Sequence, residues 1–298
     1  MRLRREGIVV REILSLLPVA WGNECLAWLG IVTQTGKEKE VLQSLKQRPE
    51  IGMSFLEMGK YNIRSVLGLR CLDDLEPYVD SLKKIPCISD VDVMMWTGIQ
   101  NMAYPGNLVI EPFDGESAVD RKSSKDLPGV WTSSTSLLND GEKRGNLPFS
   151  TFCPSIDKID ECILNALISN ARMPFSHIAE QIGISTKTVI ERYRKLRKEC
   201  VAYATLSLNL RKLGYSGYAS YNIKVSAKSW VSEVFDQVTK LPNVVAALRL
   251  IGPYNINALA PFSTPEHLKE THSSISQIPG IEKIDVQIGH SMDVWPGA

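Results

Sequence analysis

The sequence repeats itself at a displacement of 193 residues, and this repeat limits the possible folds more than any other feature. Gly59-Lys-Tyr-Asn-Ile63 agrees with Gly252-Pro-Tyr-Asn-Ile256 in four of five positions, and residues 85–93 agree with residues 278–286 in five of nine. Separate matches at one displacement indicate a duplicated structural unit. Two segments are therefore expected to be copies of one module: residues ~1–100 and ~194–292.

Each copy shows the same order of strand-length apolar runs and segments with helical spacing. The shared Gly-x-Tyr-Asn stands between the second and third strands, where Gly and Asn tolerate the positive φ of a tight turn. The order is β-α-β-β-α-β, so we expect an α+β fold with two ferredoxin-like sandwiches. The expected strands are 25–33, 51–58, 63–70 and 88–96 in the first copy and 218–225, 244–251, 256–261 and 281–288 in the second. The expected helices are 37–46 and 73–84 in the first copy, and 230–240 and 264–278 in the second.

A different rhythm, with apolar residues at helical spacing, runs over residues 157–198. Ala179, Gly183 and Val189 provide the small residue, the tight turn and the apolar anchor of a helix-turn-helix. The sequence thus predicts three helices: one that begins after Asp157, one over 175–182, and one over 186–198 that Ser185 caps.

Charge is concentrated in the third of these helices. It carries six Lys and Arg against Glu191, about +5, in a chain whose 34 basic and 33 acidic residues give a net charge of +1. A solvated helix face would also be basic, but the second helix of a helix-turn-helix needs positive charge to enter a major groove of DNA. The residues expected to contact base edges or phosphates are Ser185, Thr186, Lys187, Thr188, Arg192, Arg194, Lys195 and Lys198.

Several segments together resemble the Lrp/AsnC (feast/famine) family of transcriptional regulators. The resembling segments are residues 159–167, 178–189, 213–215, 252–255 and 278–281. The resemblance implies a winged helix for DNA followed by a ligand-sensing αβ sandwich, called a RAM domain, that assembles into oligomers. It also implies that a small effector, commonly an amino acid, binds near the turns formed by Gly59, Tyr61, Asn62, Gly252, Tyr254 and Asn255. Both turns carry Asn where the family has Asp, so a carboxylate suited to an ammonium group is absent from them.

The first copy resembles the same sandwich without its DNA-binding part. Residues 2–8 match the end of a recognition helix and the start of a wing, so the chain begins where a first helix-turn-helix would be ending. The two copies can pair with each other inside one chain, or like copies can pair between chains. Because one chain owns a single winged helix, either arrangement predicts at least a dimer of chains on a two-fold DNA site.

The remaining sequence completes the predicted organisation. Seven Ser and five Gly in residues 106–150 predict a mostly disordered linker. The predicted domains are 1–105 (first RAM-like domain), 106–152 (linker), 153–205 (winged helix) and 206–298 (second RAM-like domain). The six cysteines form no C-x-x-C pair and are expected to be reduced thiols in a cytoplasmic protein without a metal, a cofactor or a membrane segment.

Two alternative functions remain beside a DNA-binding regulator that is not an enzyme. One is a metabolite sensor that no longer binds DNA. The other is an enzyme similar to sirohaem decarboxylases, which resemble this family and can be tandem fusions of two such modules. Residues 208–215 lack the Arg-His pair expected before Gly in those enzymes, and strand 244–250 carries no His or Cys.

Overall fold

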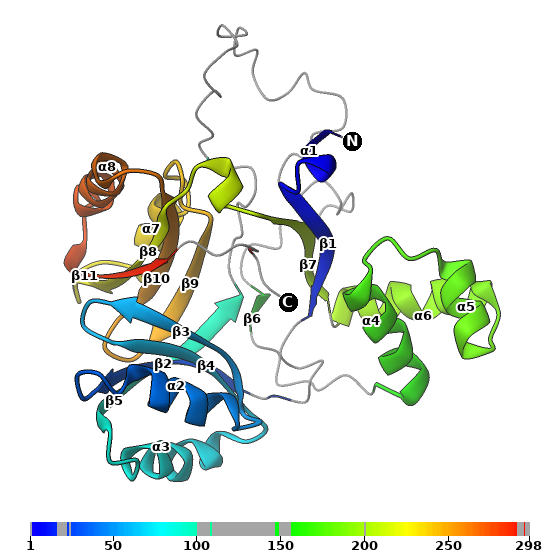
Figure 1. Ribbon diagram of the computed structural model, residues 1–298, viewed down its shortest axis with the longest axis horizontal. Coiled ribbons are helices and arrows are strands. Elements are labelled where there is room, and N and C mark those ends of the chain that lie inside the picture. The colour runs from blue at the N-terminus through cyan, green and yellow to red at the C-terminus, as the bar shows by residue number, and fades with distance from the viewer. Residues whose placement is uncertain are drawn as a thin grey trace, which may run out of the picture.

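A computed structural model describes residues 2–16, 23, 25–99, 108, 147–148, 156–199, 201–290 and 295. Two sandwich copies lie one above the other, and a module of three helices stands beside them (Figure 1). The predicted linker, 106–152, falls outside the described residues except for positions 108, 147 and 148. Among the described residues, no helix combines the length and the apolar character that crossing a membrane requires.

Both copies have the predicted β-α-β-β-α-β order, which confirms the fold class. The first copy consists of β2 (Cys25–Thr33), α2 (Glu38–Lys46), β3 (Ile51–Met58), β4 (Ile63–Leu69), α3 (Leu75–Lys83) and β5 (Ile88–Ile99). The second consists of β8 (Gly217–Val225), α7 (Val231–Val238), β9 (Ala246–Ile251), β10 (Ile256–Phe262), α8 (Pro265–Ser276) and β11 (Ile281–His290). Helix α8 begins where Thr264 accepts a hydrogen bond from the backbone N–H of His267, with Pro265 in the first turn.

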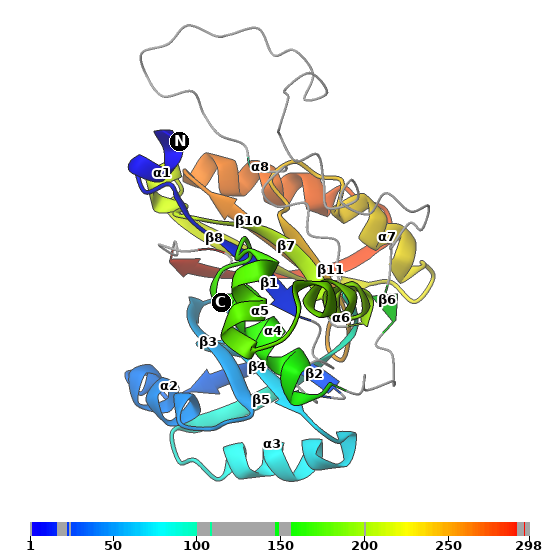
Figure 2. The same cartoon turned by 90° about the vertical axis from the view of Figure 1, so that its right-hand side faces the viewer.

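Each copy has its own core between its sheet and its two helices. In the first copy, Leu45 of α2 and Leu82 of α3 are fully buried against Leu29 and Ile63 of the sheet. The second copy repeats this packing with other side chains: Val234, Val238, Ile275, Tyr221, Ile223 and Ile256. The helices cover only the outer face of each sheet (Figure 2), so the inner faces turn toward one another.

The eight strands of the two copies close into a ring in the order β2-β4-β3-β11-β8-β10-β9-β5, with β5 returning to β2. Two short antiparallel contacts join the copies. Met58 of β3 faces Ile288 of β11, and Ile251 of β9 faces Met95 of β5. These two contacts are equivalent at the displacement of 193, so an internal two-fold axis relates the copies. In this structure the two copies pair within one chain.

The strands that precede the two copies follow the same symmetry. β1 (Val9–Leu16) pairs antiparallel with its counterpart β7 (Val201–Leu208), and Arg11 opposite Ser207 is equivalent to Leu14 opposite Ala204. A short helix α1 (Arg2–Arg5) precedes β1. The sequence match predicted the end of a recognition helix and a wing in this region, but it did not predict that the two wing strands pair with each other.

The third module is the predicted three-helix unit. Its helices are α4 (Lys158–Ser169), α5 (Phe175–Ile182) and α6 (Thr186–Glu199). Ile163, Ile178 and Val189 are fully buried where the three helices meet. Leu14 of β1 and Val201 of β7 join the same core, so the strand that precedes the first copy helps to hold the three-helix module.

The glycines of the two Gly-x-Tyr-Asn turns give a test of the pairing. Gly252 has φ of +143°, and a Cβ there would lie 2.5 Å from the carbonyl oxygen of Val93 in the other copy. Gly252→Ala should therefore lower the free energy of unfolding by about 1–3 kcal/mol from backbone strain, with an added steric penalty. Gly36→Ala is the matched control, since Gly36 has φ of +83° and a Cβ there would meet no atom within 4 Å. Equal losses in urea unfolding would contradict the steric part of this prediction.

Candidate functional site

The start of α6 is built by side chains that were predicted to lie at the DNA. Gly183 ends α5 with φ of +79°, which the tight turn requires. Ser185 Oγ accepts a hydrogen bond from the backbone N–H of Thr188 at 3.1 Å and lies 2.8 Å from Thr188 Oγ1. Ser185 and Thr188 thus cap the helix, and Thr188 is half-buried. Both of these contacts are internal to the turn.

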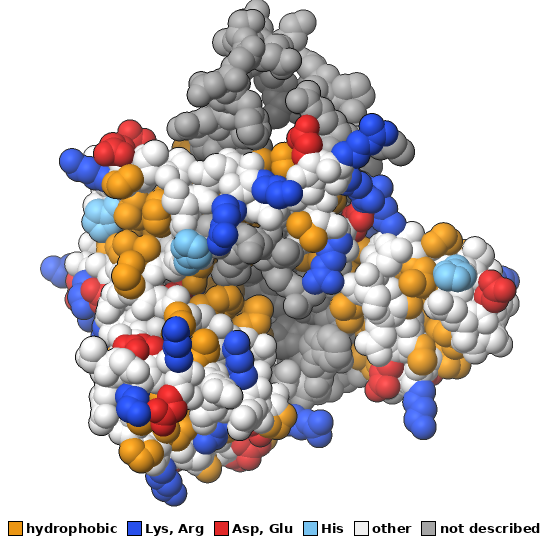
Figure 3. All heavy atoms as spheres, viewed as in Figure 1, with side chains coloured by type: hydrophobic (Ala, Val, Ile, Leu, Met, Phe, Trp, Pro, Cys, Tyr) orange, Lys and Arg blue, Asp and Glu red, His pale blue; other side chains and the backbone are white. Residues whose placement is uncertain are grey.

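One exposed stripe of α6 is basic. At 100° per residue, Lys187, Arg194 and Lys198 lie on the side opposite the buried Val189 and Leu196. All three cations are exposed, and within the described residues no ion pair occupies them. Glu191 lies on the same stripe and is exposed. Figure 3 shows the three-helix module as a lobe that projects from the paired copies.

Arg192 lies on the inner flank of the same helix and is engaged within the module. Its Nη1 donates to Asp157 Oδ2 at 2.6 Å and to Asp160 Oδ1 at 2.9 Å, at the start of α4. Asp157 in turn caps α4 by accepting from the backbone N–H groups of Ile159 and Asp160. The backbone hydrogen bond from Asp160 and the Arg192 guanidinium hold the pKa of Asp157 below its usual value. Arg192 therefore joins α6 to α4.

The eight residues expected to contact DNA differ in their exposure to solvent. Six are exposed: Ser185, Thr186, Lys187, Arg194, Lys195 and Lys198. Among these, Lys195 Nζ lies 4.0 Å from Glu199, one turn later, which is a weak surface pair. Thr188 and Arg192 are only partly exposed and have the internal contacts described above.

The two Gly-x-Tyr-Asn turns lie at the contact between the copies. Each turn packs on the last strand of the other copy, because a Cβ on Gly59 would meet the carbonyl oxygen of Val286 at 2.6 Å. The asparagines hold the turns in place. Asn62 Oδ1 accepts from the backbone N–H of Thr33, and Asn255 Oδ1 accepts from that of Val225, both at 2.9 Å.

The two turn tyrosines are buried beside the internal axis, at 0% and 2% exposure for Tyr61 and Tyr254. Tyr61 donates to Asp92 Oδ2 at 2.7 Å, and Tyr254 donates to the equivalent Asp285. Burial, followed by the neighbouring carboxylate, raises the pKa of each tyrosine, so both stay protonated donors. The structure thus brings the predicted turn residues of both copies together, but with their tyrosines closed to solvent.

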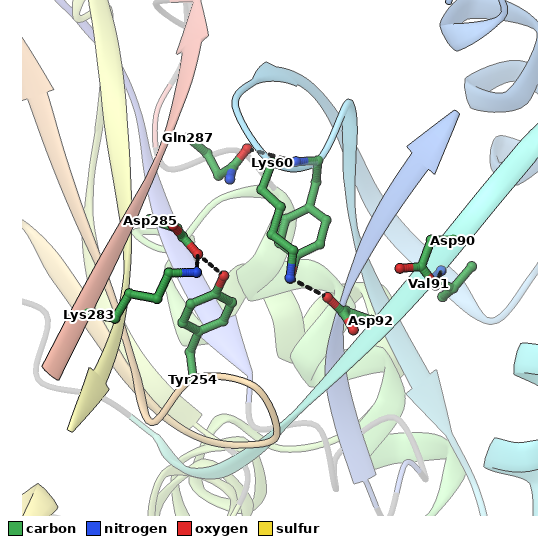
Figure 4. A network of polar contacts seen from close by, with 9 residues as sticks. Lys60, Asp90, Val91, Asp92, Tyr254, Lys283, Asp285 and Gln287 are labelled. Carbon is green, nitrogen blue, oxygen red and sulfur yellow. Dashed lines mark hydrogen bonds and ion pairs between the residues drawn. The ribbon is translucent and has the colours of Figure 1, made fainter. Parts of the chain in front are cut away.

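Two lysines complete these clusters (Figure 4). Lys60 Nζ lies 2.7 Å from Asp92 Oδ2, and Lys283 Nζ lies 2.8 Å from Asp285 Oδ2. Burial alone would raise the pKa of Asp92, but hydrogen bonds from Lys60 and Tyr61 outweigh it and lower that pKa. Both lysines are exposed, so the outer ends of the clusters present ammonium and carboxylate groups to solvent.

The sequence patterns did not mark these two Lys-Asp pairs as site residues. A signal for the carboxylates existed, because Asp92 and Asp285 are identical positions within the repeat match of 85–93 with 278–286. No comparable signal existed for the lysines. Lys60 stands where the second copy has Pro253, and Lys283 stands where the first copy has Asp90.

Comparison with known proteins matches the second half of the chain to DNA-binding proteins. A family model described as the AsnC-type helix-turn-helix domain matches residues 156–197. The HTH-type transcriptional regulator FL11 of Pyrococcus horikoshii is 31% identical over 128 residues, which cover 43% of this chain and 84% of that protein. An uncharacterised HTH-type transcriptional regulator of Pyrococcus furiosus is 32% identical over 136 residues, covering 44% of this chain and 90% of that protein.

A solved structure resembles the whole chain in fold. The siroheme decarboxylase NirDL superposes with a TM-score of 0.59 at 13% identity, covering 97% of this chain and 78% of that one. At this identity the likeness concerns the fold alone.

The Arg192 contacts predict a structural effect. Arg192→Ala should lower the melting temperature at pH 7, because α6 loses its link to the start of α4. The depressed pKa of Asp157 means that its contribution is present above the ordinary carboxyl pKa and disappears as pH falls through the folded value. The gap between variant and wild type should therefore be constant from pH 7 to pH 5 and narrow at more acid pH. Thermal melting by circular dichroism measures this, with Lys195→Ala as the exposed control; equal curves for the two variants would refute the assignment.

Proposed function

The chain belongs to the Lrp/AsnC family of transcriptional regulators, and we propose that it reads specific DNA sites through α6 and controls transcription through its state of assembly. The observation that carries this proposal is the exposed basic stripe on the second helix of the helix-turn-helix. The proposal keeps the predicted division into domains 1–105, 106–152, 153–205 and 206–298 and a cytoplasmic location.

The placement of side chains on α6 supports separate roles in the proposed complex. Thr186 and Lys187 stand in the first turn, which enters the major groove deepest in this motif, so they contact base edges. Arg194, Lys195 and Lys198 lie about two to three turns later and contact phosphates. Ser185 and Thr188 hold the start of α6, and Arg192 joins α6 to α4. These three residues therefore position the DNA-contacting side chains and do not contact DNA themselves.

Reading a two-fold site requires two such helices. The described part of one chain contains a single three-helix module, and the internal pairing of the two copies occupies the inner faces of both sheets. A second reading helix must then come from a second chain. We propose that the DNA-bound form is at least a dimer of whole chains.

A small effector, such as an amino acid, is the second part of the proposal. Asp92 and Asp285 supply, beside the turns, the carboxylates that Asn62 and Asn255 cannot provide. With the exposed Lys60 and Lys283 they offer partners for both the ammonium and the carboxylate of an amino acid. A ligand that prefers one arrangement of the copies would shift the assembly in proportion to its difference in affinity.

The proposal assigns no catalysis to the chain. It rests on the transcriptional regulators found by sequence, whereas the siroheme decarboxylase shares only the fold. A Soret-band titration with sirohaem separates these two functions, and a gel shift with the upstream DNA of the gene separates the regulator from a sensor that does not bind DNA.

The salt dependence of DNA binding tests the stripe. Lys187→Ala, Arg194→Ala and Lys198→Ala combined should weaken binding and make the slope of log affinity against log salt shallower by about 0.9 per lost phosphate contact, or roughly 1.8 for the contacts of Arg194 and Lys198. The matched control, Lys39→Ala, Lys83→Ala and Lys84→Ala, removes the same charge from exposed positions on α2 and at the end of α3. Fluorescence anisotropy at several salt concentrations measures both, and similar slopes for the two triple variants would rule out the proposed interface.

The number of chains on DNA gives an independent test. Light scattering of the complex with a palindromic duplex, with half-sites about 34 Å apart, should give two chains or a multiple of two per duplex. A half-site duplex serves as the control and should bind one reading helix with lower affinity. A single chain bound to the full palindrome would contradict the dimer.

A further inference from the structure

A buried ion pair lies between the two sheets. Arg64 of β4 is 3% exposed, and its Nη2 lies 2.5 Å from Oε1 of Glu57, which is 6% exposed. Arg64 Nη1 also donates across the interface to Ser220 Oγ and, at 3.4 Å, to Asn257 Oδ1. The guanidinium stacks 4.5 Å from the centre of the Trp28 ring. The first copy therefore places a charged side chain inside the pairing surface.

Arg64 and Asn257 are equivalent positions, because they are separated by the repeat displacement of 193. A side chain that contacts its own counterpart lies on the internal two-fold axis. In a pair made of two first copies, the axis would bring Arg64 against a second Arg64. The second copy carries a neutral side chain at this position, so the observed pairing avoids the clash of like charges.

The hydrogen bonds between the copies are one-sided in the same way. Each of three joins residues whose counterparts cannot form the equivalent bond. Arg64 donates to Ser220, whose counterpart is Ala27. Tyr218 donates to Glu57 at 3.0 Å, and their counterparts are Cys25 and Leu250.

The third bond joins the backbone N–H of Tyr61 to Gln287 Oε1 at 3.2 Å. The counterpart of Gln287 is Met94, which has no oxygen to accept from Tyr254. All three bonds disappear when a first copy meets a first copy. Leaving buried polar and charged groups without partners costs far more than the bonds contribute when they are made.

We propose that Arg64 and Glu57 determine the pairing specificity of the chain: the inner face of the first copy accepts only the Ser220–Asn257 face of a second copy, and rejects another first copy. Specificity arises here from repulsion in the wrong pair as well as attraction in the right one. The consequence is that each chain folds upon itself and presents one reading helix. Two chains then meet through other surfaces, so this inference does not depend on DNA binding.

The strand register supplies reporters for the test in the full chain. Residues 58 of β3 and 288 of β11 face each other. In the double variant Met58→Cys with Ile288→Cys, oxidation should therefore form a disulfide within the chain when the copies pair as observed. Met58→Cys with Met95→Cys reports the wrong pairing, since the internal symmetry would place residue 58 of one chain opposite residue 95 of another. Chains are refolded from denaturant at micromolar concentration, and single-cysteine parents correct for native cysteines.

The variant Glu57→Leu with Arg64→Asn gives the first copy the residues of the second at both positions. When Glu57 and Arg64 are both present, the chain that carries Met58→Cys and Met95→Cys should form no more covalent dimer than its single-cysteine parents. In the variant, this dimer should rise to about ten times the background of the single-cysteine parents, which corresponds to a loss of roughly 1.4 kcal/mol of discrimination. A native chain that forms 58–95 dimers, or a folded variant with no increase, would overturn the proposal.

A second pair of variants covers the case in which the first does not fold. Asn257→Arg places a second guanidinium against Arg64, whereas Asn257→Gln keeps a neutral amide of similar reach. Asn257→Arg should melt lower than Asn257→Gln by roughly 5 °C or more. Equal melting temperatures would show that position 257 does not sense the charge of Arg64, and the proposal would fail.

Discussion

Each Gly-x-Tyr-Asn turn reaches across the molecule to the last strand of the other copy, and this exchange fixes the rest of the structure. The turns bury Tyr61 and Tyr254 beside the axis, where Asp92 and Asp285 accept their hydroxyl protons in hydrogen bonds. Because the turns hold the ends of β3 and β9 on the facing strands, the two sheets close into one ring. The helices of the two copies lie on the outside, and β1 and β7 hold the three-helix module at one edge.

Duplication followed by divergence explains how one chain can replace a pair of identical subunits. The backbone keeps the two-fold relation, as the equivalent registers of β1 with β7 and of the two seams show. The side chains on the inner faces do not keep it. Arg64 and Glu57 on one side meet Ser220 and Tyr218 on the other, so the two faces are complementary to each other rather than to themselves.

The cations of α6 have two different roles. The chain has a net charge of +1, so attraction to DNA depends on where the cations stand rather than on their number. Lys187, Arg194 and Lys198 form the outer stripe, while the charge of Arg192 is engaged by Asp157 and Asp160. A helix can therefore be strongly basic in composition and still assign one of its cations to the fold.

The sequence by itself determined the local structure and the duplication. Hydrophobic periods of 3.6 and 2 residues depend only on neighbours along the chain, so they placed α5 and nearly all of α6, and they predicted β2 and β3 to the residue. The repeat displacement revealed two copies and marked Tyr61 and Tyr254 as equivalent. Only the tertiary structure decided that these tyrosines are buried, that Arg192 turns inward and that Arg64 sits on an axis. Those facts depend on distances between residues up to 226 positions apart, such as Tyr61 and Gln287, and packing rather than local periodicity sets such distances.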